Sequence, residues 1–494
     1  MGKQHILRKI KVLHVSPEMT PLSKVGGLAD VAFSLPEELR KCDVDARILT
    51  CAYPSVLDKA KDLGSKPVYS RRTVHVALNW KVFSGKIWKT FIRELPVYIL
   101  DNPELFTNER IYPNYLDQES ALPFFFLSYA ALEVGTALNW HPDIIHSHDW
   151  STSPLASAVK WHPFYSNYSR SIKTVLTIHN LAHQGILDPS LLNMTGLMEG
   201  FHIDGLEYYG LVNLLKGSIN SSDRITTVSP TYAREISEPG RGMGLDGLIR
   251  TNSHKLLGIL NGIDTEHWDP SRDNFLPASY SIGNLEGKKQ ARGKMLEFFR
   301  WNDNGSPIFC NIGRLYDQKG LDILIPSLPE LVESGAKFVF LGSGEKHYEE
   351  ELRELSEAYP GSVGVITGFN EPLAHLIYAG ADFFLMPSLF EPCGLSQLIS
   401  MRYGTIPVAR RTGGIADTVS DEDTDRTGFL FNGYSREELV GAVKRALECY
   451  GSSESHKTVM KNAMEKDFSW KTSAGKYHRL YRELASFDHK QDIK

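Results

Sequence analysis

Two short segments of the chain carry a cation, a pair of glycines and an aspartate at the same spacing. They are KVGGLAD at residues 24–30 and RTGGIAD at residues 411–417, and each precedes a segment with helical periodicity. Glycines let a ligand approach the backbone closely, and free N–H groups at a helix N-terminus attract anions. A Gly-Gly pair also makes an ordinary tight turn into a helix. Because the pattern occurs twice, we predict loops that bind an anionic, phosphate-bearing ligand.

Two further segments place charged side chains directly after strand-like runs in the C-terminal half. Arg314 and Lys319 lie in GRLYDQKG at residues 313–320, and both side chains are good phosphate ligands. SLFEPCGLS at residues 388–396 brings Glu391 to the same expected sheet edge. Surface cations are usually only solvated, and a lone Glu-Pro often starts a helix. Neither segment therefore identifies a site by itself.

Short apolar runs separated by helix-length spacers recur in two series, a pattern typical of βαβ units and parallel sheets. The first series comprises residues 11–15, 46–51, 97–100, 143–146, 174–178 and 224–228, and the second comprises residues 307–312, 337–341, 363–367, 383–386 and 406–409. Residues 265–306 between the two series are rich in Pro, Gly, Asn and Asp. We therefore predict an α/β protein of two domains with a border near this segment.

Three other segments extend this prediction. Residues 72–91 alternate apolar and polar side chains around Ser84-Gly85, which predicts a hairpin around this pair, or an edge excursion, rather than another parallel strand. The uncharged run 120–132 is well short of the ~20 residues that span a membrane, so we expect a buried helix. A stripe of aromatic and aliphatic residues predicts a final helix packed against one domain. The stripe comprises Phe468, Trp470, Tyr477, Leu480, Tyr481 and Leu484.

Length and composition exclude several classes of protein. A chain of 494 residues exceeds the common domain size of about 100–200 residues, which excludes a single small binding module. With 54 Lys+Arg against 59 Asp+Glu, the net charge of −5 lacks the basic excess expected for a nucleic-acid partner. The five cysteines are scattered and form no C-x-x-C pair, which favours a reducing compartment. The N-terminus carries no signal-peptide core or transit-peptide stretch.

Taken together, seven motifs resemble the bacterial glycogen synthase and plant starch synthase family in order and spacing. They are SPEMTPLSKVGGLADV (16–31), HSHDW (146–150), TIHNLAHQG (177–185), NGID (261–264), GRLYDQKGLD (313–322), SLFEPCGLSQL (388–398) and YGTIPVARRTGGIADTV (403–419). The resemblance covers nearly the whole chain. It implies a GT-B architecture, in which two Rossmann-like, doubly wound α/β domains face a central cleft. The implied domains are residues 1–262 on the acceptor side and 263–467 on the donor side, and a helix at 468–487 returns to the first domain.

The reaction implied by the resemblance transfers glucose from ADP-glucose to the non-reducing-end 4-hydroxyl of an α-1,4-glucan or maltooligosaccharide, with retention of the α configuration. We expect no nucleic-acid partner and no membrane partner. The expected location is the cytoplasm, or the plastid stroma if a transit peptide has been removed. Two alternatives stay open: another GT-B nucleotide-sugar enzyme that uses UDP-glucose, and a catalytically inactive glucan-binding or initiation scaffold. Val25 and Ser151 depart from the usual bacterial pattern and leave the acceptor open between glycogen, maltooligosaccharides and starch.

The resemblance also implies roles for individual residues. The expected catalytic residues are Lys24, His179, Arg314, Lys319 and Glu391. The expected donor-binding residues are Lys24, Gly26, Gly27, Asp30, Asn180, Asn261, Arg314, Lys319, Phe369, Cys393, Gly394, Leu395 and Ser396, and Asp149 is expected on the acceptor side. Cations and amides would stabilise the departing diphosphate, and the His179 carbonyl or the Glu391 carboxylate would stabilise the sugar. The sequence leaves open which of the two does so, and whether a covalent Glu391 intermediate forms.

Many glycosyltransferases hold the diphosphate through a metal ion bound by a D-x-D motif. Asp43-Val-Asp45 and Asp421-Glu-Asp423 have this spacing. The first pair precedes a strand in a turn-like position, and the second lies in an acidic segment that resembles a surface loop. Because several cations are already available for the diphosphate, we expect no metal and no cofactor.

Overall fold

The computed structural model describes residues 8–488, and the chain divides into two units. Unit 1 takes in the described residues up to Asn261 together with those from Trp470 onward, and unit 2 is Gly262–Ser469. The borders predicted after residues 262 and 467 lie one and two residues from these breaks. Residues 265–306, predicted to lie near the border, belong to unit 2, where they include helix α9 (Glu286–Phe298).

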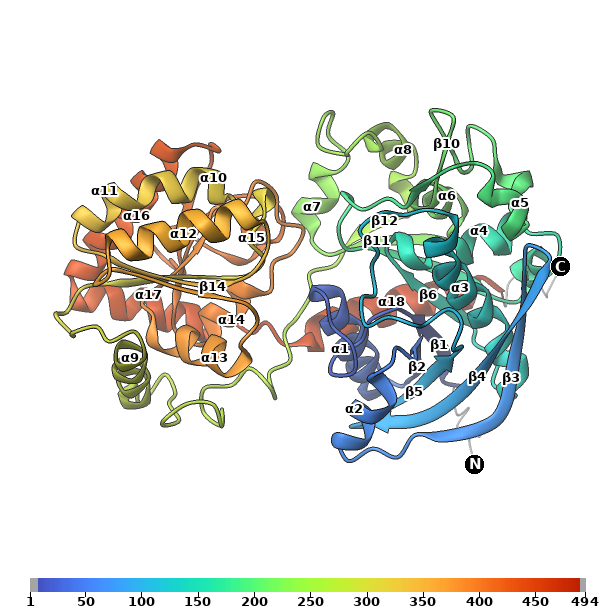
Figure 1. The fold of residues 1–494 in the computed structure, drawn as a ribbon, viewed down its shortest axis with the longest axis horizontal. Helices are drawn as coiled ribbons and strands as arrows, with labels where there is room; N and C mark the ends of the chain where they lie inside the picture. The colour runs from blue at the N-terminus through green and yellow to red at the C-terminus, as the bar shows by residue number, and fades with distance from the viewer. Residues whose placement is uncertain (1–7, 489–494) are drawn as a thin grey trace, which may run out of the picture. The chain divides into compact units, whose positions relative to one another are not determined.

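Unit 1 is built on a nine-stranded sheet with the order β12-β11-β7-β6-β1-β2-β5-β4-β3 (Figure 1). Its strands are β1 (Ile10–Val15), β2 (Val44–Cys51), β3 (Val68–Leu78), β4 (Lys81–Ile92), β5 (Leu95–Asp101), β6 (Ile144–His148), β7 (Lys173–Ile178), β11 (Arg224–Thr227) and β12 (Leu256–Gly258). All neighbours pair in parallel except β3 with β4 and β4 with β5. The six runs predicted in the first half of the chain are all strands of this sheet.

Helices and a small second sheet complete unit 1. The helices are α1 (Gly27–Lys41), α2 (Val56–Asp62), α3 (Gln118–Leu138), α4 (Pro154–Trp161), α5 (Leu191–Thr195), α6 (Leu214–Ser221), α7 (Pro230–Glu235), α8 (Asp246–Thr251) and α18 (Trp470–Asp488). The small antiparallel sheet consists of β8 (Ile186–Leu187), β9 (Glu207–Tyr208) and β10 (Leu211–Asn213). None of these three short strands was predicted, because runs of two or three residues carry no periodicity.

The predicted hairpin exists, but its turn lies elsewhere. The chain reverses at Asn79-Trp80, where Asn79 takes the left-handed conformation with φ of 61°. Gly85 instead lies within β4 and pairs with Val74. A Cβ atom on Gly85 would lie 2.6 Å from the Cδ1 atom of Leu100, so this glycine allows a close packing contact. The prediction of a turn at Ser84-Gly85 was therefore wrong because the glycine serves the core.

The apolar run at 120–132 forms most of α3, as predicted. Phe125, Phe126 and Tyr129 on this helix are fully buried in the core of unit 1. Among residues 8–488, α3 is the one helix long and apolar enough to cross a membrane, and 67% of its most apolar window is buried. This burial is typical of a core helix.

The last helix, α18, packs on the sheet of unit 1, as predicted; it is red in Figure 1 and lies beside α1 and β1. Its buried residues recur every three or four positions, which places them on one face. They are Trp470, Ala474, Tyr477, Leu480, Tyr481 and Leu484. Phe468, predicted to share this stripe, packs in unit 2 instead, because the helix begins only at Trp470 and the Phe468 carbonyl accepts the Ile263 N–H at 2.8 Å.

Unit 2 has a six-stranded, fully parallel sheet with the order β15-β14-β13-β16-β17-β18. Its strands are β13 (Ile308–Ile312), β14 (Lys337–Gly342), β15 (Val363–Thr367), β16 (Phe383–Met386), β17 (Ile406–Arg410) and β18 (Phe429–Phe431). The five runs predicted in the second half of the chain are all present, and the short β18 was not predicted. Counted from β13, this is the strand order 3-2-1-4-5-6 of a doubly wound sheet, which confirms the predicted α/β class.

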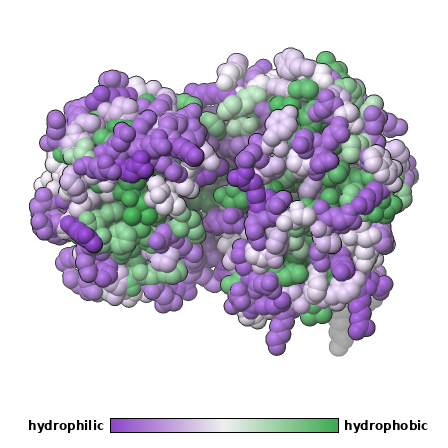
Figure 2. All heavy atoms as spheres, viewed as in Figure 1, coloured by the Kyte–Doolittle hydropathy of each residue, from purple (hydrophilic) through white to green (hydrophobic). Residues whose placement is uncertain are grey.

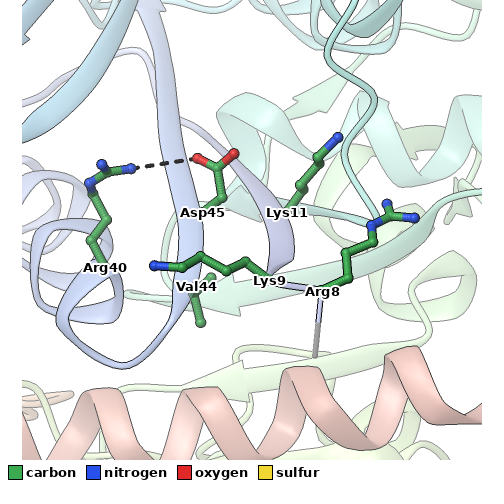
Figure 3. A pocket seen from close by; sticks show the side chains of 6 residues that line it. All are labelled: Arg8, Lys9, Lys11, Arg40, Val44 and Asp45. Atoms are coloured by element: carbon green, nitrogen blue, oxygen red, sulfur yellow. Dashed lines mark hydrogen bonds and ion pairs between the residues drawn. The ribbon is translucent and has the colours of Figure 1, made fainter. Parts of the chain in front are cut away.

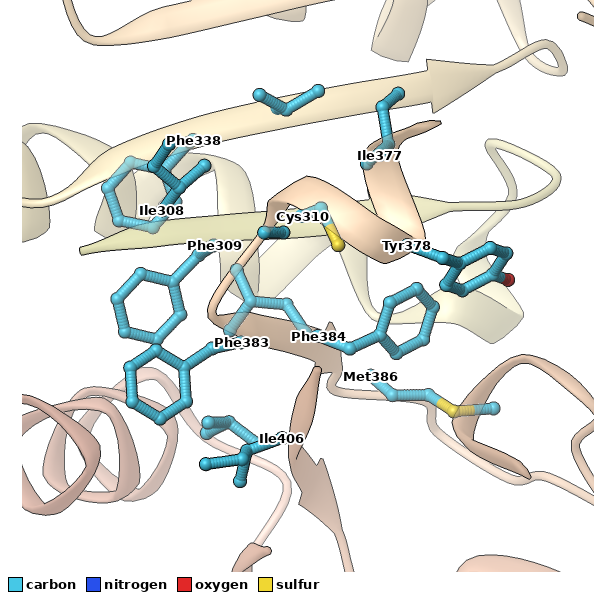
Figure 4. Close-up of a cluster of buried hydrophobic side chains, with 14 of the residues drawn as sticks. Ile308, Phe309, Cys310, Phe338, Ile377, Tyr378, Phe383, Phe384, Met386 and Ile406 are labelled. Atoms are coloured by element: carbon cyan, nitrogen blue, oxygen red, sulfur yellow. The ribbon is translucent and has the colours of Figure 1, made fainter. Parts of the chain in front are cut away.

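The helices of unit 2 cover an aromatic core. Besides α9, they are α10 (Leu321–Leu324), α11 (Leu328–Glu333), α12 (Lys346–Ala358), α13 (Glu371–Gly380), α14 (Ser396–Arg402), α15 (Gly413–Thr418), α16 (Arg436–Gly451) and α17 (Ser453–Glu465). Figure 4 shows part of this core, in which the Phe309 ring is stacked 4.7 Å from Phe383 and 5.5 Å from Phe338. Aromatic side chains of neighbouring strands thus pack against one another in this core. On the surface, Figure 2 shows hydrophilic residues over much of the visible face, with apolar residues grouped between them.

Candidate active site

In each unit, the predicted site residues follow the strands at which the order of the sheet reverses. In unit 1 this point lies between β1 and β6, and in unit 2 it lies between β13 and β16. Lys24 and Asp149 follow β1 and β6, whereas Arg314 and Glu391 follow β13 and β16. Open α/β sheets bind ligands at the carboxyl ends of such strands. The topology therefore gives each unit a group of functional side chains at its expected binding edge.

The N-terminal glycine loop is held by an acidic residue that the sequence did not single out. Glu18 Oε2 accepts the Val25 N–H at 2.6 Å and the Gly26 N–H at 3.1 Å, just before α1. The predicted Lys24 and Asp30 form an ion pair at 2.7 Å. A Cβ atom on Gly26 would meet nothing within 4 Å, so the loop has open space beside it. Glu18 thus holds two of the loop amides in this structure, and binding of an anion by the loop stays a prediction.

Glu18 itself is almost completely buried. Its Oε1 atom accepts the hydroxyl of Tyr112 at 2.9 Å, across a sequence separation of 94 residues. Burial raises the pKa of Glu18, while the two loop N–H groups and Tyr112 act to lower it. Glu18 and Tyr112 are the residues that sequence reasoning missed here. Glu18 lies within the SPEMTPLSKVGG motif, but nothing in the sequence indicated its contacts with the loop or with Tyr112.

Asp149 fixes the backbone after β7. It has a φ of 57°, and its Oδ1 atom accepts the His179 N–H at 2.6 Å and the Asn180 N–H at 3.4 Å. Burial raises the pKa of Asp149 to about 7, although the two N–H groups act to lower it, and the nearby Glu18 carboxylate raises it further. Asp149 thus contacts two other predicted site residues, His179 and Asn180, whereas its place on the acceptor side stays a prediction.

The raised pKa of Asp149 predicts a pH-dependent stability. The pKa of Asp149 is about 7 in the folded protein and ordinarily 3.8. At a pH between these two values, Asp149 keeps its proton in the folded protein but has lost it in the unfolded chain. The contribution of Asp149 to the free energy of unfolding therefore falls as the pH rises through this interval. In urea unfolding over a pH series, Asp149→Asn should gain stability relative to the wild type as the pH approaches 7. A difference between the two proteins that does not change with pH would contradict the shift.

His179 is linked to a second buried histidine. Its Nε2 atom lies 3.0 Å from Nδ1 of His148, and burial lowers the pKa of His179 well below its ordinary value. Asn180 accepts the N–H of Ala182 through Oδ1 at 3.0 Å. Asn261, the last residue of the first part of unit 1, is buried, and its Oδ1 atom has no hydrogen-bond partner within the described part of the chain.

In unit 2, two of the predicted catalytic residues form an ion pair. Lys319 Nζ lies 2.6 Å from Glu391 Oε2, and the Ser388 hydroxyl donates to the same oxygen at 3.0 Å. Glu391 is only 6% exposed, so this carboxylate is held in one position. Arg314 is exposed, and its guanidinium lies 5.4 Å from the centre of the Tyr316 ring. A fixed carboxylate and two cations thus follow β13 and β16 of the same sheet.

The glycines of the RTGG segment pack against the segment that contains Glu391. The Gly414 N–H donates to the Glu391 carbonyl at 3.1 Å. A Cβ atom on Gly413 would lie 1.9 Å from that carbonyl oxygen, and one on Gly414 would lie 2.2 Å from the Cys393 carbonyl oxygen. These glycines therefore let two loops of unit 2 pack backbone to backbone. Of the two glycine loops, the N-terminal one thus has open space beside Gly26, whereas the C-terminal one is packed against backbone at Gly413 and Gly414.

The remaining predicted donor-binding residues lie in two segments of unit 2. Phe369 is 84% exposed and follows Gly368, which has a φ of 111°. Cys393 is buried, Gly394 has a φ of 74°, and Leu395 and Ser396 lead into α14. Gly394 thus takes a left-handed backbone conformation shortly before α14 begins.

Aspartates in both segments with D-x-D spacing form ion pairs with arginines. Asp45 pairs with Arg47 at 2.9 Å, and Asp421 pairs with Arg426 at 2.9 Å. Three groups of side chains bring metal-binding atoms within 4.8 Å of one another in the described part of the chain. They are His14, His146 and His148; His267, Glu371 and His375; and Asp317, Glu345 and His347. In the first group, hydrogen bonds to Tyr481 and Thr177 already engage both ring nitrogens of His146.

A basic hollow in unit 1 contains none of the predicted site residues. Figure 3 shows Arg8, Lys9, Lys11 and Arg40 around Asp45, with the ion pair between Arg40 and Asp45 drawn. Aspartates already neutralise part of this charge, because Arg8 pairs with Asp143 at 2.7 Å and Lys9 with Asp43 at 3.1 Å. The hollow is therefore a network of surface ion pairs.

Both halves of the chain match known protein families. Residues 11–251 match the family described as starch synthase catalytic domain, and residues 296–466 match glycosyl transferases group 1. The chain is 40% identical to the glycogen synthase of Thermodesulfovibrio yellowstonii, over 96% of this chain and 98% of that protein. It is also 40% identical to the glycogen synthase of Myxococcus xanthus, over 97% of this chain and 100% of that protein.

Two solved structures resemble this one. The catalytic domain of starch synthase IV from Arabidopsis thaliana, bound to ADP and acarbose, has a TM-score of 0.89 at 32% identity and covers 97% of this chain and 100% of its own. Sucrose-phosphate synthase from Thermosynechococcus elongatus, with a TM-score of 0.59 at 14% identity, covers 97% of this chain and 100% of its own and shares the fold alone. These similarities confirm the predicted fold of two Rossmann-like α/β domains.

Proposed function

Since the chain belongs to the glycogen and starch synthase family of glycosyltransferases, we propose that its donor is ADP-glucose and that it extends an α-1,4-glucan. The observation that carries the proposal is the ion pair between Lys319 and Glu391, with Arg314 after the neighbouring strand of the same sheet. It supports binding of a diphosphate next to a fixed carboxylate. The related starch synthase IV was solved with ADP and acarbose, which supports an adenine nucleotide and a glucan as ligands.

In the proposed reaction, the bond between the anomeric carbon of glucose and the diphosphate breaks, and the 4-hydroxyl of the acceptor takes the glucose with retention of configuration. Arg314, Lys319 and Lys24 stabilise the negative charge that develops on the departing diphosphate. The His179 carbonyl or the Glu391 carboxylate stabilises the positive charge on the sugar ring. Both hydrogen bonds of the Glu391 side chain go to Oε2, which supports a role for Oε1 toward the substrate.

The other proposed donor-binding residues act around these charges. Phe369 stacks on the adenine ring, as the high exposure of its side chain allows. The amides of residues 393–396 bind the glucose and phosphate, and His179 and Asn180 contact the transferred glucose. We also propose that Asp149 acts near the acceptor. Its hydrogen bonds to the backbone of His179 and Asn180 support a place next to the sugar.

We further propose that the enzyme needs no metal ion and no cofactor and acts in the cytoplasm, or in the plastid stroma if a transit peptide has been removed. The three cations support the first point, because they can neutralise a diphosphate. The thiols support a reducing compartment. All five cysteines are free, and burial raises the pKa of Cys51 and Cys310.

A donor and acceptor panel tests the proposal. With glycogen or maltooligosaccharides as acceptor, ADP-glucose should be turned over faster than UDP-glucose, with release of ADP and growth of the glucan. Both are measured, as nucleotide release and as product length. EDTA should leave the rate with ADP-glucose unchanged.

The two alternatives give different outcomes in the same panel. Faster turnover of UDP-glucose would overturn the donor assignment while leaving the family unaffected. Glucan binding without any elongation, by a folded sample and with either donor, would point to the inactive scaffold. Nucleotide release without growth of the glucan would contradict transfer to the acceptor.

A further inference from the structure

Three histidine rings form a hydrogen-bonded line that ends at His179. His14 on β1 places its Nδ1 atom 3.3 Å from Nε2 of His148 at the end of β6. His148 in turn places its Nδ1 atom 3.0 Å from Nε2 of His179, which follows β7. Strands β1, β6 and β7 are neighbours in the sheet of unit 1, which brings the three rings together. Only His179 at the end of this line is partly exposed.

The three rings are uncharged at neutral pH. Burial lowers the pKa of His14 and His179 well below the ordinary value and that of His148 to about 3. A neutral imidazole carries one N–H donor and one bare nitrogen. Each hydrogen bond of the line therefore has one donor and one acceptor, and its direction at one ring fixes the direction at the next.

The direction of the hydrogen bonds along the line is set at His14, the end opposite His179. The Nε2 atom of His14 is buried and has no hydrogen-bond partner among residues 8–488. An N–H group buried without an acceptor is rarer in proteins than an acceptor without a donor. We therefore assign the lone pair to Nε2 of His14 and the hydrogen to Nδ1. His14 then donates to His148, and His148 donates through Nδ1 to Nε2 of His179.

We propose that His14 and His148 are positioning residues that hold His179 in the tautomer with its hydrogen on Nδ1. In this state His179 presents an N–H donor to the substrate, since Nε2 accepts from His148. A donor at this position suits a sugar hydroxyl oxygen. The inference rests on the proposed contact of His179 with the transferred glucose, and it adds to that contact the direction of the hydrogen bond.

His146 lies beside the line of three histidines but has a structural role, and it therefore serves for comparison. Its ring is stacked 4.4 Å from the His148 ring and tilted against the His14 ring at 4.8 Å, and it is fully buried. Its hydrogen bonds go to the Tyr481 hydroxyl at 2.7 Å and the Thr177 hydroxyl at 2.6 Å, so it takes no part in the line. If the histidines only filled space, His14 and His146 would be equivalent. The proposed line predicts instead that a change at His14 alters the His179 tautomer, whereas a change at His146 does not.

The ring nitrogens can be observed directly in the full-length protein. Long-range ¹H–¹⁵N spectra of histidine-labelled protein distinguish protonated from bare ring nitrogens, and a His179→Gln variant assigns the His179 signals. We expect a protonated Nδ1 and a bare Nε2 on His179. A protonated Nε2, or a mixture of the two tautomers in the wild type, would overturn the proposal. This spectrum needs no donor substrate, so it tests the line even if the proposed function fails.

Variants at His14 link the tautomer to catalysis. His14→Leu removes the donor, and we expect a mixed His179 tautomer and a roughly tenfold fall in kcat/KM, the order that one lost hydrogen bond causes. His14→Asn keeps an N–H donor near the same position and should restore both the spectrum and most of the rate. His146→Gln is the matched control and should leave the His179 tautomer unchanged. Equal losses in His14→Leu and His14→Asn, with an unchanged His179 spectrum, would show that His14 acts only through packing.

Discussion

Replacing Glu391 with alanine is expected to lower kcat at least about 100-fold, the order seen when one group that stabilises a transition state is removed. The carboxylate is held by Lys319 and Ser388 and is nearly buried, so it needs little rearrangement when charge develops on the substrate. Initial rates with saturating ADP-glucose and glycogen measure the effect. A kcat near that of the wild type would mean that the site is misplaced.

Two further variants separate catalysis from stability. Glu391→Ala leaves the half-buried Lys319 without its partner, which by itself destabilises unit 2. Glu391→Gln keeps a hydrogen-bonding oxygen for Ser388 and Lys319 but removes the charge, so it should fold well and still lose most of the rate. Glu330→Ala is the matched control, because Glu330 pairs with Arg436 and Lys444 on the surface of the same unit. It should keep the wild-type rate.

Arg314→Ala is expected to lower kcat by a similar factor, at least about 100-fold, because it removes a planar cation from the departing diphosphate. Arg314 is exposed, so its truncation should leave the thermal stability unchanged. Arg314→Lys keeps the charge without the bidentate geometry and should recover part of the rate. Arg353 on α12 is another exposed arginine of unit 2, and Arg353→Ala should behave as the wild type. Equal rates in Arg314→Ala and Arg353→Ala would contradict the role.

The strands of the parallel sheets could be predicted because they are buried between layers of helices. Both faces of a parallel sheet are covered by helices, so its strands are continuous apolar runs that stand out from the spacers. Every run of this kind in the two series is a strand in the structure. The strands that escaped prediction, β8, β9, β10, β12 and β18, have two or three residues each and carry too little pattern.

Glycines predicted the local structure least well, because a glycine can mark a turn, a close packing contact or a loop that approaches a ligand. The sequence predicts a turn at Gly85, yet in the structure this glycine lies within a strand and makes room for Leu100 and Phe126. Gly413 and Gly414 fit the same pattern as the N-terminal loop, but they make room for the backbone of residues 391–393. Which atom approaches a glycine depends on tertiary contacts, and the sequence around it does not contain that information.

The predicted site residues were recoverable as members of motifs, whereas their partners were not. Lys319 and Glu391 are separated by 72 residues, and each stood out because it lies in a recognisable segment. Glu18 lies within one of the seven motifs, but the motif does not indicate its contacts, and Tyr112 and His14 lie outside all of them. Tyr112 lies in a loop without periodicity, and His14 is one polar residue within a strand. Only the register of neighbouring strands and the path of the loops bring them to the site.

The return of α18 to unit 1 affects the order in which the protein can fold. Unit 2 is one continuous segment, whereas unit 1 is assembled from the two ends of the chain. Tyr477 and Tyr481, which cover β1 and β6, leave the ribosome only after the whole of unit 2 has been made. Unit 2 can therefore complete its core first, and the face of unit 1 that carries His14 and His146 stays uncovered until α18 has been made.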